Sequence, residues 1–286
     1  FFDAMVGIDQ VLEKLSTVID PDLKKDIVSM GMIKDLELND GDLKFTLELT
    51  TPACPFNVEI EDDVRKVIAE LSDLKNFDLN VTAKVMEGRS LEADTQMATV
   101  KNIIGVASGK GGVGKSTVSL NLALALSQTG AKVGLLDADI YGPSIPLMLG
   151  MKDGSMEVED NKLQPADCNG LKVVSFGFFA DQSNQAAIYR GPIISGILKQ
   201  FLVDTNWSEL DYLIVDLPPG TGDIPLTLAQ TIPITGILVI TTPQDVASNV
   251  AVKAVSMFEK LNVPIIGVIE NMSHFICPNC DDKHYI

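Results

Sequence analysis

Along the first 87 residues, the spacing of hydrophobic positions changes several times. Two segments place apolar residues at helical spacing, and two others alternate apolar and polar positions as half-buried strands do. The predicted elements are helices over 7–18 and 56–71, a hairpin over 34–49 and a strand over 77–85. The hairpin turns at Asn39–Asp42, a type of turn that favours tight antiparallel pairing. We therefore expect residues 1–87 to form a small α+β domain, followed by a polar linker over 88–99.

From residue 100 onward, short apolar runs alternate with segments of helical spacing. The predicted strands are 102–107, 132–136, 171–176, 211–216, 236–241 and 264–270, and the predicted helices are 115–129, 191–204, 224–231 and 245–261. Several of the strands are apolar at nearly every position, as strands buried on both faces should be. This alternation predicts an α/β domain over 100–286 with a doubly wound, mostly parallel sheet. Its ligand should lie at the carboxyl ends of the strands.

Residues 109–117, Gly-Lys-Gly-Gly-Val-Gly-Lys-Ser-Thr, fit the phosphate-loop pattern G-x-x-x-x-G-K-[ST] between a predicted strand and a predicted helix. The glycines allow successive backbone N–H groups to line a nest for an anion, and the helix N-terminus adds partial positive charge. Lys115 is expected to reach the terminal phosphates, Ser116 to ligate Mg²⁺, and Thr117 to donate to an inner phosphate. The predicted nucleotide-binding residues of the loop are Gly109, Lys110, Gly111, Gly112, Val113, Gly114, Lys115, Ser116 and Thr117.

Lys110 is a second lysine that the phosphate-loop pattern does not require. Loop geometry should direct it away from its own strand. It could then neutralise charge on a nucleotide bound by a facing subunit, as an arginine finger does. The alternative is a solvated surface lysine.

Carboxylates follow two of the predicted strands, where a Mg-nucleotide would need them. Asp216 is expected to hold Mg²⁺ in the Walker-B role, and Asp137 to support Mg²⁺ or its waters. Asp139, which leads into a loop, is the candidate for orienting the attacking water. A strand-ending Asp also commonly caps a helix or forms a turn, but two such ends beside a phosphate loop favour catalysis. The predicted catalytic residues are Lys110, Lys115 and Asp139.

Composition narrows the class of protein further. The net charge of −17 disfavours nonspecific nucleic-acid binding, which depends on lysine and arginine. No apolar run approaches the ~20 residues that span a bilayer, and no leader precedes the first domain, so a cytoplasmic location without membrane partners is expected. Because the chain begins with Phe1 and stops soon after a cysteine pair, we expect a trimmed N-terminus and a missing C-terminal segment.

The cysteine pair is Cys277-Pro-Asn-Cys280. Two thiolates are half of the ligands that a closed zinc or [4Fe–4S] site needs, and two chains of a symmetric dimer would supply four. A thiol/disulfide pair remains open, as does a structural zinc knuckle completed by the missing C-terminal segment. His274 and His284 flank the pair and could serve as zinc ligands or be surface histidines. Cys54 precedes a predicted helix, where its pKa would fall, so it is an accessory candidate for cluster or partner contact; it could equally be a small buried residue. Cys168 is assigned no role.

These motifs together resemble a known family. The loop with its extra lysine, Asp137–Asp139 and Asp216–Asp223 are similar to the deviant-Walker-A ATPases, the group of nitrogenase iron protein and MinD. Residues 141–146, 216–223, 270–272 and 277–280 resemble the Mrp/ApbC/Nbp35 iron–sulfur cluster carriers, and residues 49–55 resemble the MIP18 (DUF59) domain that precedes the ATPase in many of them. The resemblance implies a homodimer with ATP between the subunits, Lys110 crossing to the partner and Asn271 contacting adenine. It also implies a [4Fe–4S] cluster on Cys277 and Cys280.

The sequence therefore predicts a dimeric, ATP-hydrolysing carrier that passes a labile [4Fe–4S] cluster to apo-proteins and works with a cluster assembly scaffold. Hydrolysis is expected to act through the loops at 137–146 and 216–223, which would alter the exposure of the two cysteines. One rival is a MinD/ParA-type positioning ATPase acting on membrane or DNA. The other is a binding module in which ATP is only structural.

Overall fold

The structure is a computed structural model that describes residues 7–21, 23–50, 56–71, 74–84, 99–151, 156–159, 162–178 and 191–285. The chain divides into two compact units, residues 1–86 and 87–286. Most of the predicted linker lies outside the described residues. Among the described residues, no helix is both long and apolar enough to cross a membrane.

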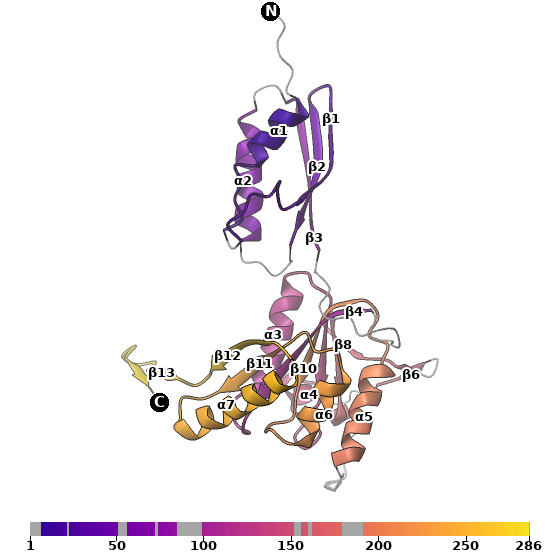
Figure 1. The fold of residues 1–286 in the computed structure, drawn as a ribbon, viewed down its shortest axis with the longest axis vertical. Coiled ribbons are helices and arrows are strands. Elements are labelled where there is room, and N and C mark those ends of the chain that lie inside the picture. The colour runs from indigo at the N-terminus through magenta and orange to yellow at the C-terminus, as the bar shows by residue number, and fades with distance from the viewer. Residues whose placement is uncertain are drawn as a thin grey trace, which may run out of the picture. The chain divides into compact units, whose positions relative to one another are not determined.

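The described residues of the first unit form a three-stranded sheet that packs against helices, and these elements can be followed in Figure 1. Its elements in chain order are α1 (Ile8–Leu15), β1 (Ile33–Asn39), β2 (Asp42–Leu49), α2 (Asn57–Ala69) and β3 (Asn76–Ala83). The strand order is β1-β2-β3, with β1 antiparallel and β3 parallel to β2. The predicted hairpin is confirmed, and Asp40 and Gly41 turn with positive φ values of 49° and 90°, as a tight hairpin turn requires.

The core of this unit follows the predicted periodicity. Residues at alternate positions of β2 are buried, and they pack against one stripe of each helix. The fully buried set includes Val11, Leu15, Leu43, Phe45, Leu47, Ile60, Val64 and Ile68. The first unit thus has a hydrophobic core of its own.

The second unit is the predicted doubly wound α/β domain. Its main sheet has the order β12-β11-β4-β10-β5-β9-β8, and every neighbouring pair is parallel except β8 with β9. The strands are β4 (Val100–Ser108), β5 (Val133–Asp137), β8 (Ala166–Cys168), β9 (Leu171–Ser175), β10 (Leu210–Asp216), β11 (Gly236–Thr241) and β12 (Ile265–Glu270). The helices are α3 (Lys115–Gln128), α4 (Ile145–Met148), α5 (Gly191–Val203), α6 (Asp223–Thr231) and α7 (Asp245–Lys260), with a 3₁₀ turn η1 (Phe176–Phe178).

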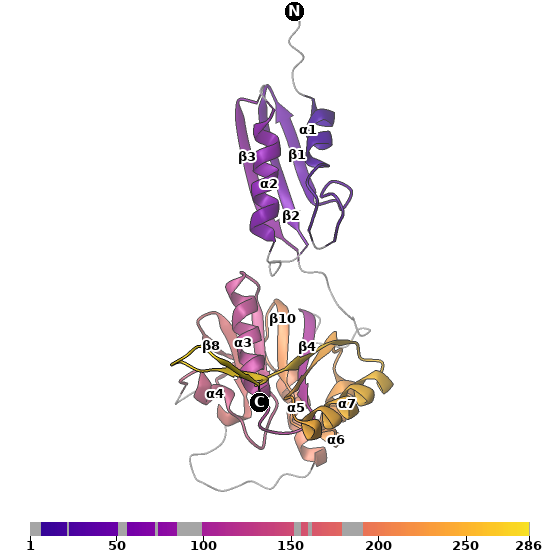
Figure 2. The same ribbon diagram turned by 90° about the vertical axis from the view of Figure 1, so that its left-hand side faces the viewer.

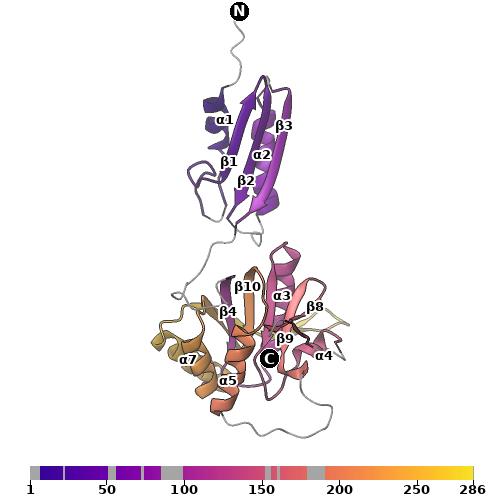
Figure 3. The same ribbon diagram turned by 90° about the vertical axis from the view of Figure 1, so that its right-hand side faces the viewer.

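Two hydrophobic cores lie on opposite faces of this sheet. Successive residues of β4 pack into different cores. Val106 packs into the core under α3, and Ala107 packs into the core under α5, α6 and α7. Figure 2 and Figure 3 show α3 on one side of the sheet and α5–α7 on the other. The central strands are therefore buried on both faces, which explains their nearly continuous apolar runs.

Several short elements were not predicted. The loop after β5 leads into the single turn α4, with Pro146 in the first turn, where proline is tolerated. Strand β8 and two small hairpins are also new: β6 (Val158–Glu159) with β7 (Lys162–Leu163), and β13 (His274–Ile276) with β14 (Lys283–Tyr285). Such two- and three-residue strands are too short to show a period in the sequence.

Candidate nucleotide and thiol sites

The strand order brings the predicted site residues together at one edge of the sheet. Strand β10 lies between β4, which ends at the phosphate loop, and β5. In the register of the ladders, Asp216 pairs with Val106 of β4 on one side and with Asp137 of β5 on the other. Because all three strands are parallel, their carboxyl ends meet here. The loop and both acidic strand ends therefore form one site.

The glycines of the phosphate loop have identifiable reasons to be glycine. Gly112 and Gly114 have φ values of 78° and 85°, in the left-handed region that other residues rarely adopt. A Cβ on Gly109 would lie 2.7 Å from the backbone carbonyl carbon of Val250 in α7, so this glycine permits the loop to contact that helix. Gly114 is also the N-cap of α3, and the loop passes directly into the helix N-terminus. This is the geometry of an anion-binding loop.

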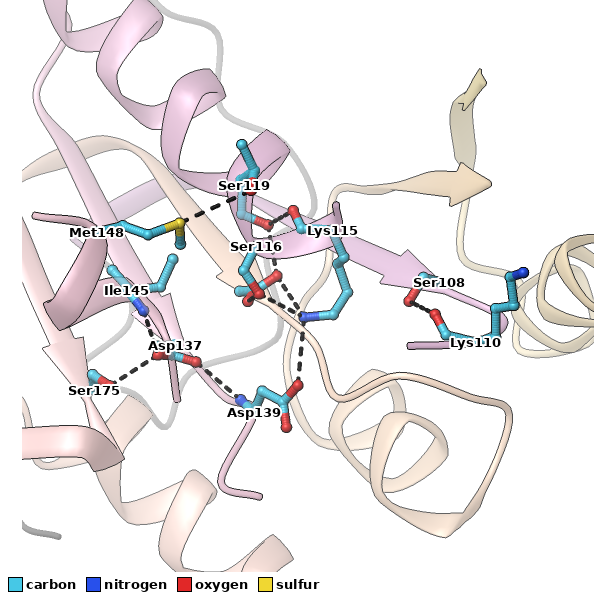
Figure 4. A network of polar contacts seen from close by, with 12 residues as sticks. Ser108, Lys110, Lys115, Ser116, Ser119, Asp137, Asp139, Ile145, Met148 and Ser175 are labelled. Atoms are coloured by element: carbon cyan, nitrogen blue, oxygen red, sulfur yellow. Dashed lines mark hydrogen bonds and ion pairs between the residues drawn. The ribbon is translucent and has the colours of Figure 1, made fainter. Parts of the chain in front are cut away.

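The Asp216 carboxylate accepts hydrogen bonds from three side chains of α3, those of Lys115, Ser116 and Ser119, which Figure 4 labels. The Lys115 ammonium donates to Asp216 Oδ1 over 2.7 Å, and the Ser116 hydroxyl donates to Oδ2 over 2.5 Å. Lys115 Nζ also lies 3.9 Å from Asp139 Oδ2. Lys115 is only 6% exposed and Asp216 is fully buried, so these charges are held in a low-dielectric setting that strengthens their pairing. Lys115 and Ser116, predicted from the phosphate loop, thus lie in direct contact with Asp216, predicted from a strand end.

Asp137 is buried beside Asp216 and organises the loop that follows it. Its carboxylate accepts hydrogen bonds from the Asp139 N–H (3.2 Å), the Ile145 N–H (3.3 Å) and the Ser175 hydroxyl (3.0 Å). Burial raises the pKa of Asp137 to about 6, and the negative charge of Asp216 adds to that shift. Asp137 therefore shapes the 137–145 loop in addition to any role at Mg²⁺.

Asp139 lies beside Lys115, and its side chain is partly exposed. Burial raises the pKa of its carboxyl, Lys115 opposes this shift, and Asp216 adds to it. A carboxylate whose pKa is raised is a better proton acceptor than an ordinary one. The position and the electrostatics of Asp139 suit a group that orients and polarises a water molecule.

The donor set fits Mg²⁺. Ser116 and Asp216 offer hard oxygen atoms, which this ion prefers, and Asp137 adds a second carboxylate within the same cluster. Burial and the charge of Asp216 raise the pKa of Asp137, and a divalent cation would relieve the repulsion between these two carboxylates. The chemistry of these residues thus agrees with the predicted metal role.

Lys110 and Thr117 lie apart from the Asp216 cluster. Figure 4 shows the Lys110 side chain directed away from Lys115 and Asp139. Its carbonyl oxygen accepts a hydrogen bond from the Ser108 hydroxyl over 3.0 Å. The Thr117 hydroxyl lies 3.9 Å from Met148 Sδ in α4. The contact of Lys110 with a partner subunit stays a prediction.

Asn271 follows the last strand of the sheet and contacts the phosphate loop. Its side-chain amide donates to the Val113 carbonyl over 2.9 Å. The predicted adenine contact of Asn271 stays a prediction, but its place beside the loop is clear.

Cys277 and Cys280 lie in the turn of the β13–β14 hairpin. Cys280 is exposed and Cys277 is half-buried. The Cys277 N–H donates to the Asp282 carbonyl and the Asp281 N–H donates to the Cys277 carbonyl, which closes the turn. The backbone N–H of Asn279 lowers the pKa of the Cys277 thiol, as do the thiol and the N–H of Cys280. The turn therefore favours the thiolate form that binds metals.

The described residues of one chain do not complete a metal site around these thiols. No group of three or more His, Cys, Asp or Glu in the described part of the chain is arranged to hold a metal ion. His274 and His284 lie on the two strands of the hairpin, and the His274 ring packs beside Tyr285 with centroids 6.2 Å apart. Cys54 lies outside the described residues.

Two hydroxyl groups that contact the acidic residues of the site were not predicted from the sequence. The Ser119 hydroxyl lies 2.7 Å from Asp216 Oδ1 and 3.0 Å from the Lys115 carbonyl, and the Ser175 hydroxyl donates to Asp137. Ser119 lies one helical turn after Lys115, so it shares a face with it, and this spacing was the available signal. Ser175 ends β9, and only the strand order shows that it neighbours Asp137.

A glycine-rich loop opens a helix on a doubly wound sheet, and a buried lysine of that helix meets a carboxylate from the adjacent strand. These features define a P-loop nucleotide-binding protein. Comparison with known proteins agrees. Residues 99–286 match the ParA family of NUBPL iron-transfer P-loop NTPases, and the chain belongs to this family. Residues 8–77 match the iron–sulfur cluster assembly protein family.

Individual relatives extend the similarity over both units. The chain is 47% identical to an iron–sulfur cluster carrier protein of Synechocystis, over 98% of this chain and 80% of that protein. It is also 47% identical to a chloroplastic Fe–S cluster assembly factor of Arabidopsis thaliana, over 99% of this chain but 53% of that protein. Among solved structures, a nucleotide-binding protein of Archaeoglobus fulgidus in complex with ADP is 41% identical, with a TM-score of 0.59, over 67% of this chain and 74% of that one.

Proposed function

We propose that this protein is an ATP-hydrolysing, homodimeric carrier that holds a labile [4Fe–4S] cluster and passes it to apo-proteins. The observation that carries the proposal is the exposed hairpin with Cys277 and Cys280, in a chain of the iron-transfer P-loop NTPase family. The relatives named as iron–sulfur carriers and assembly factors support this cargo.

The number of ligands favours a dimer. An iron–sulfur cluster of this kind is held by four thiolates, and each hairpin presents two. Two copies related by a two-fold axis would bring two hairpins to one cluster. Because each subunit would then hold half of the ligands, separation of the hairpins would release the cargo. An exposed site of this kind suits transfer to another protein better than a buried one.

The geometry of the nucleotide site supports a role for each of its residues. Lys115 would pair with the terminal phosphates, and Ser116 and Asp216, with Asp137 behind them, would hold Mg²⁺, which neutralises phosphate charge when bound. Asp139, with its raised pKa, would orient the attacking water and accept its proton. Lys110, which is directed out of its own site, would act on the nucleotide of the partner subunit.

The test is anaerobic reconstitution of the full chain with iron and sulfide, followed by counting of both elements. The wild type should hold about four iron and about four sulfide per dimer, and the double variant Cys277→Ser/Cys280→Ser should hold none. Cys168→Ser is the matched control, because Cys168 lies in β8, and this variant should load like the wild type. A double variant that retains the cluster, or a wild type that takes up one zinc ion instead, would overturn the cargo assignment.

A further inference from the structure

The cysteine hairpin is joined to the sheet through a short segment. Strand β12 ends at Glu270 and β13 begins at His274, so Asn271, Met272 and Ser273 connect the two. Figure 1 shows β13 beyond the end of β12, at the outer side of the sheet. The hairpin residues around the two cysteines are exposed. The orientation of the thiols relative to the NTPase unit therefore depends on the conformation of these three residues, which we name the 271–273 joint.

The joint is anchored to two parts of the nucleotide-binding unit. The backbone N–H of Asn271 donates to the Thr241 carbonyl over 2.8 Å, which ties it to the end of β11. The side-chain amide of Asn271 donates to the Val113 carbonyl over 2.9 Å, which ties it to the phosphate loop. Val113 is itself only 1% exposed. Asn271 thus bridges the sheet, the loop and the hairpin.

The approach of Asn271 to the loop is close and needs a glycine. A Cβ on Gly114 would lie 2.3 Å from Asn271 Nδ2 and 3.7 Å from Met272 Cε. The next residue, Met272, has a φ of 55°, in the left-handed region that a side chain such as methionine rarely adopts. The joint is therefore bent at Met272 and held against the loop at Asn271, and both features constrain the direction in which the hairpin leaves.

From this geometry we infer that Asn271 is a positioning residue that couples occupancy of the phosphate loop to the orientation of the cysteine hairpin. The inference rests on the proposed nucleotide site. The Val113 carbonyl and the Gly114 N–H belong to one peptide group, and in a trans peptide they point in opposite directions. A phosphate that accepts from the Gly114 N–H polarises this peptide, which makes the Val113 carbonyl a stronger acceptor for Asn271.

The polarised peptide also sets the direction of the coupling between the nucleotide and the hairpin. Bound nucleotide strengthens the hydrogen bond between Asn271 and Val113, so it holds the 271–273 joint in one conformation and restricts the hairpin. Reagents should then reach Cys277 and Cys280 more slowly when nucleotide is bound. Because coupling between two sites is reciprocal, a constraint on the hairpin should in turn tighten nucleotide binding.

The experiment measures alkylation of the two cysteines by N-ethylmaleimide in the full, metal-free chain, followed by mass spectrometry of the 277–280 peptide. Rates are compared with and without saturating MgADP, and saturation is established for each variant by titration. In the wild type, MgADP should slow alkylation about fivefold or more, within the usual range of site-to-site coupling. In Asn271→Ala and in the isosteric Asn271→Asp, which lacks the amide donor, MgADP should leave the rate unchanged.

Asn121→Ala is the matched control. The Asn121 amide also donates to a backbone carbonyl, that of Thr117 over 2.8 Å, but it lies on α3 away from the joint. This variant should keep the full effect of MgADP. The inference is overturned if MgADP binds the wild type without changing the alkylation rate, or if either Asn271 variant keeps the wild-type response at saturation. If MgADP does not bind the wild type at all, the proposed nucleotide site fails, and the coupling fails with it.

Discussion

At the scale of single residues, the site is organised around one carboxylate. Asp216 receives the ammonium of Lys115 and the hydroxyls of Ser116 and Ser119, all from the first turns of α3. Charge-assisted hydrogen bonds of this kind are stronger than neutral ones, and their removal leaves a buried charge without a partner. Asp137 lies on the adjacent strand, and burial and the negative charge of Asp216 disfavour its ionised form. The pKa of Asp137 is raised as a result.

Asp137 gives a prediction about pH and stability. Its pKa is about 6 in the folded chain against a usual 3.8, so between these values the folded state binds more protons than the unfolded state. Stability should therefore decrease as pH rises through this window and level off above pH 6. Between pH 5 and pH 7, the free energy of unfolding should fall by about 1 kcal/mol more in the wild type than in Asp137→Asn.

The measurement is urea unfolding followed by tryptophan fluorescence. Trp207 is the single tryptophan of the chain and is buried in the core of the second unit, so its signal reports that unit. Parallel pH profiles of the wild type and Asp137→Asn would contradict the prediction.

At the scale of helices and strands, the long elements were predictable and the short ones were not. The phosphate-loop strand and helix, and the strands ending at Asp137 and Asp216, carry clear hydrophobic periods, and the structure has all of them. Adjacency of the two acidic ends was not predictable, because it depends on β10 inserting between β4 and β5. The β13–β14 hairpin was not predictable either, because three-residue strands with exposed side chains leave no pattern.

The packing of α7 against the phosphate loop gives a prediction at this scale. Gly109→Ala would place a methyl group 2.7 Å from the backbone of Val250, so either the loop or the helix must move. Overpacking of this kind should lower the free energy of unfolding by about 1–3 kcal/mol. Gly111→Ala is the control in the same loop, because a Cβ there meets nothing within 4 Å and its φ is not positive. Urea unfolding followed by Trp207 fluorescence compares the two, and equal losses would show that the Val250 contact does not matter.

At the scale of the whole molecule, the chain holds two units with separate cores, and we propose that a second copy completes the thiol site. The family could be expected from motifs in the sequence, because the phosphate loop and the strand-ending carboxylates have a recognisable spacing. The contact of Asn271 with the phosphate loop could not be expected from the sequence, because 158 positions separate the two partners. Only the parallel order of the strands brings them together.

The proposal of a cluster shared by two chains gives a prediction about mass. One chain has a mass of 30.8 kDa, and reconstitution with iron and sulfide in the absence of nucleotide should double the mass in solution. Removal of the cluster with an iron chelator should return it to that of a single chain, as measured by light scattering on a sizing column. Cys280→Ser should not respond to iron and sulfide. A loaded wild type that stays at the mass of one chain would contradict the bridging arrangement.

The lowered pKa of Cys277 has a consequence for chemistry with oxygen. A thiolate is the nucleophile in sulfur oxidation, and Cys280 lies beside it as a resolving thiol. An oxidant that converts Cys277 to a sulfenic acid would let Cys280 displace hydroxide and close a disulfide, which removes both ligands at once. Iron and oxidants thus compete for the same two sulfur atoms, and the fraction of protein able to accept cargo should follow the redox poise of its surroundings.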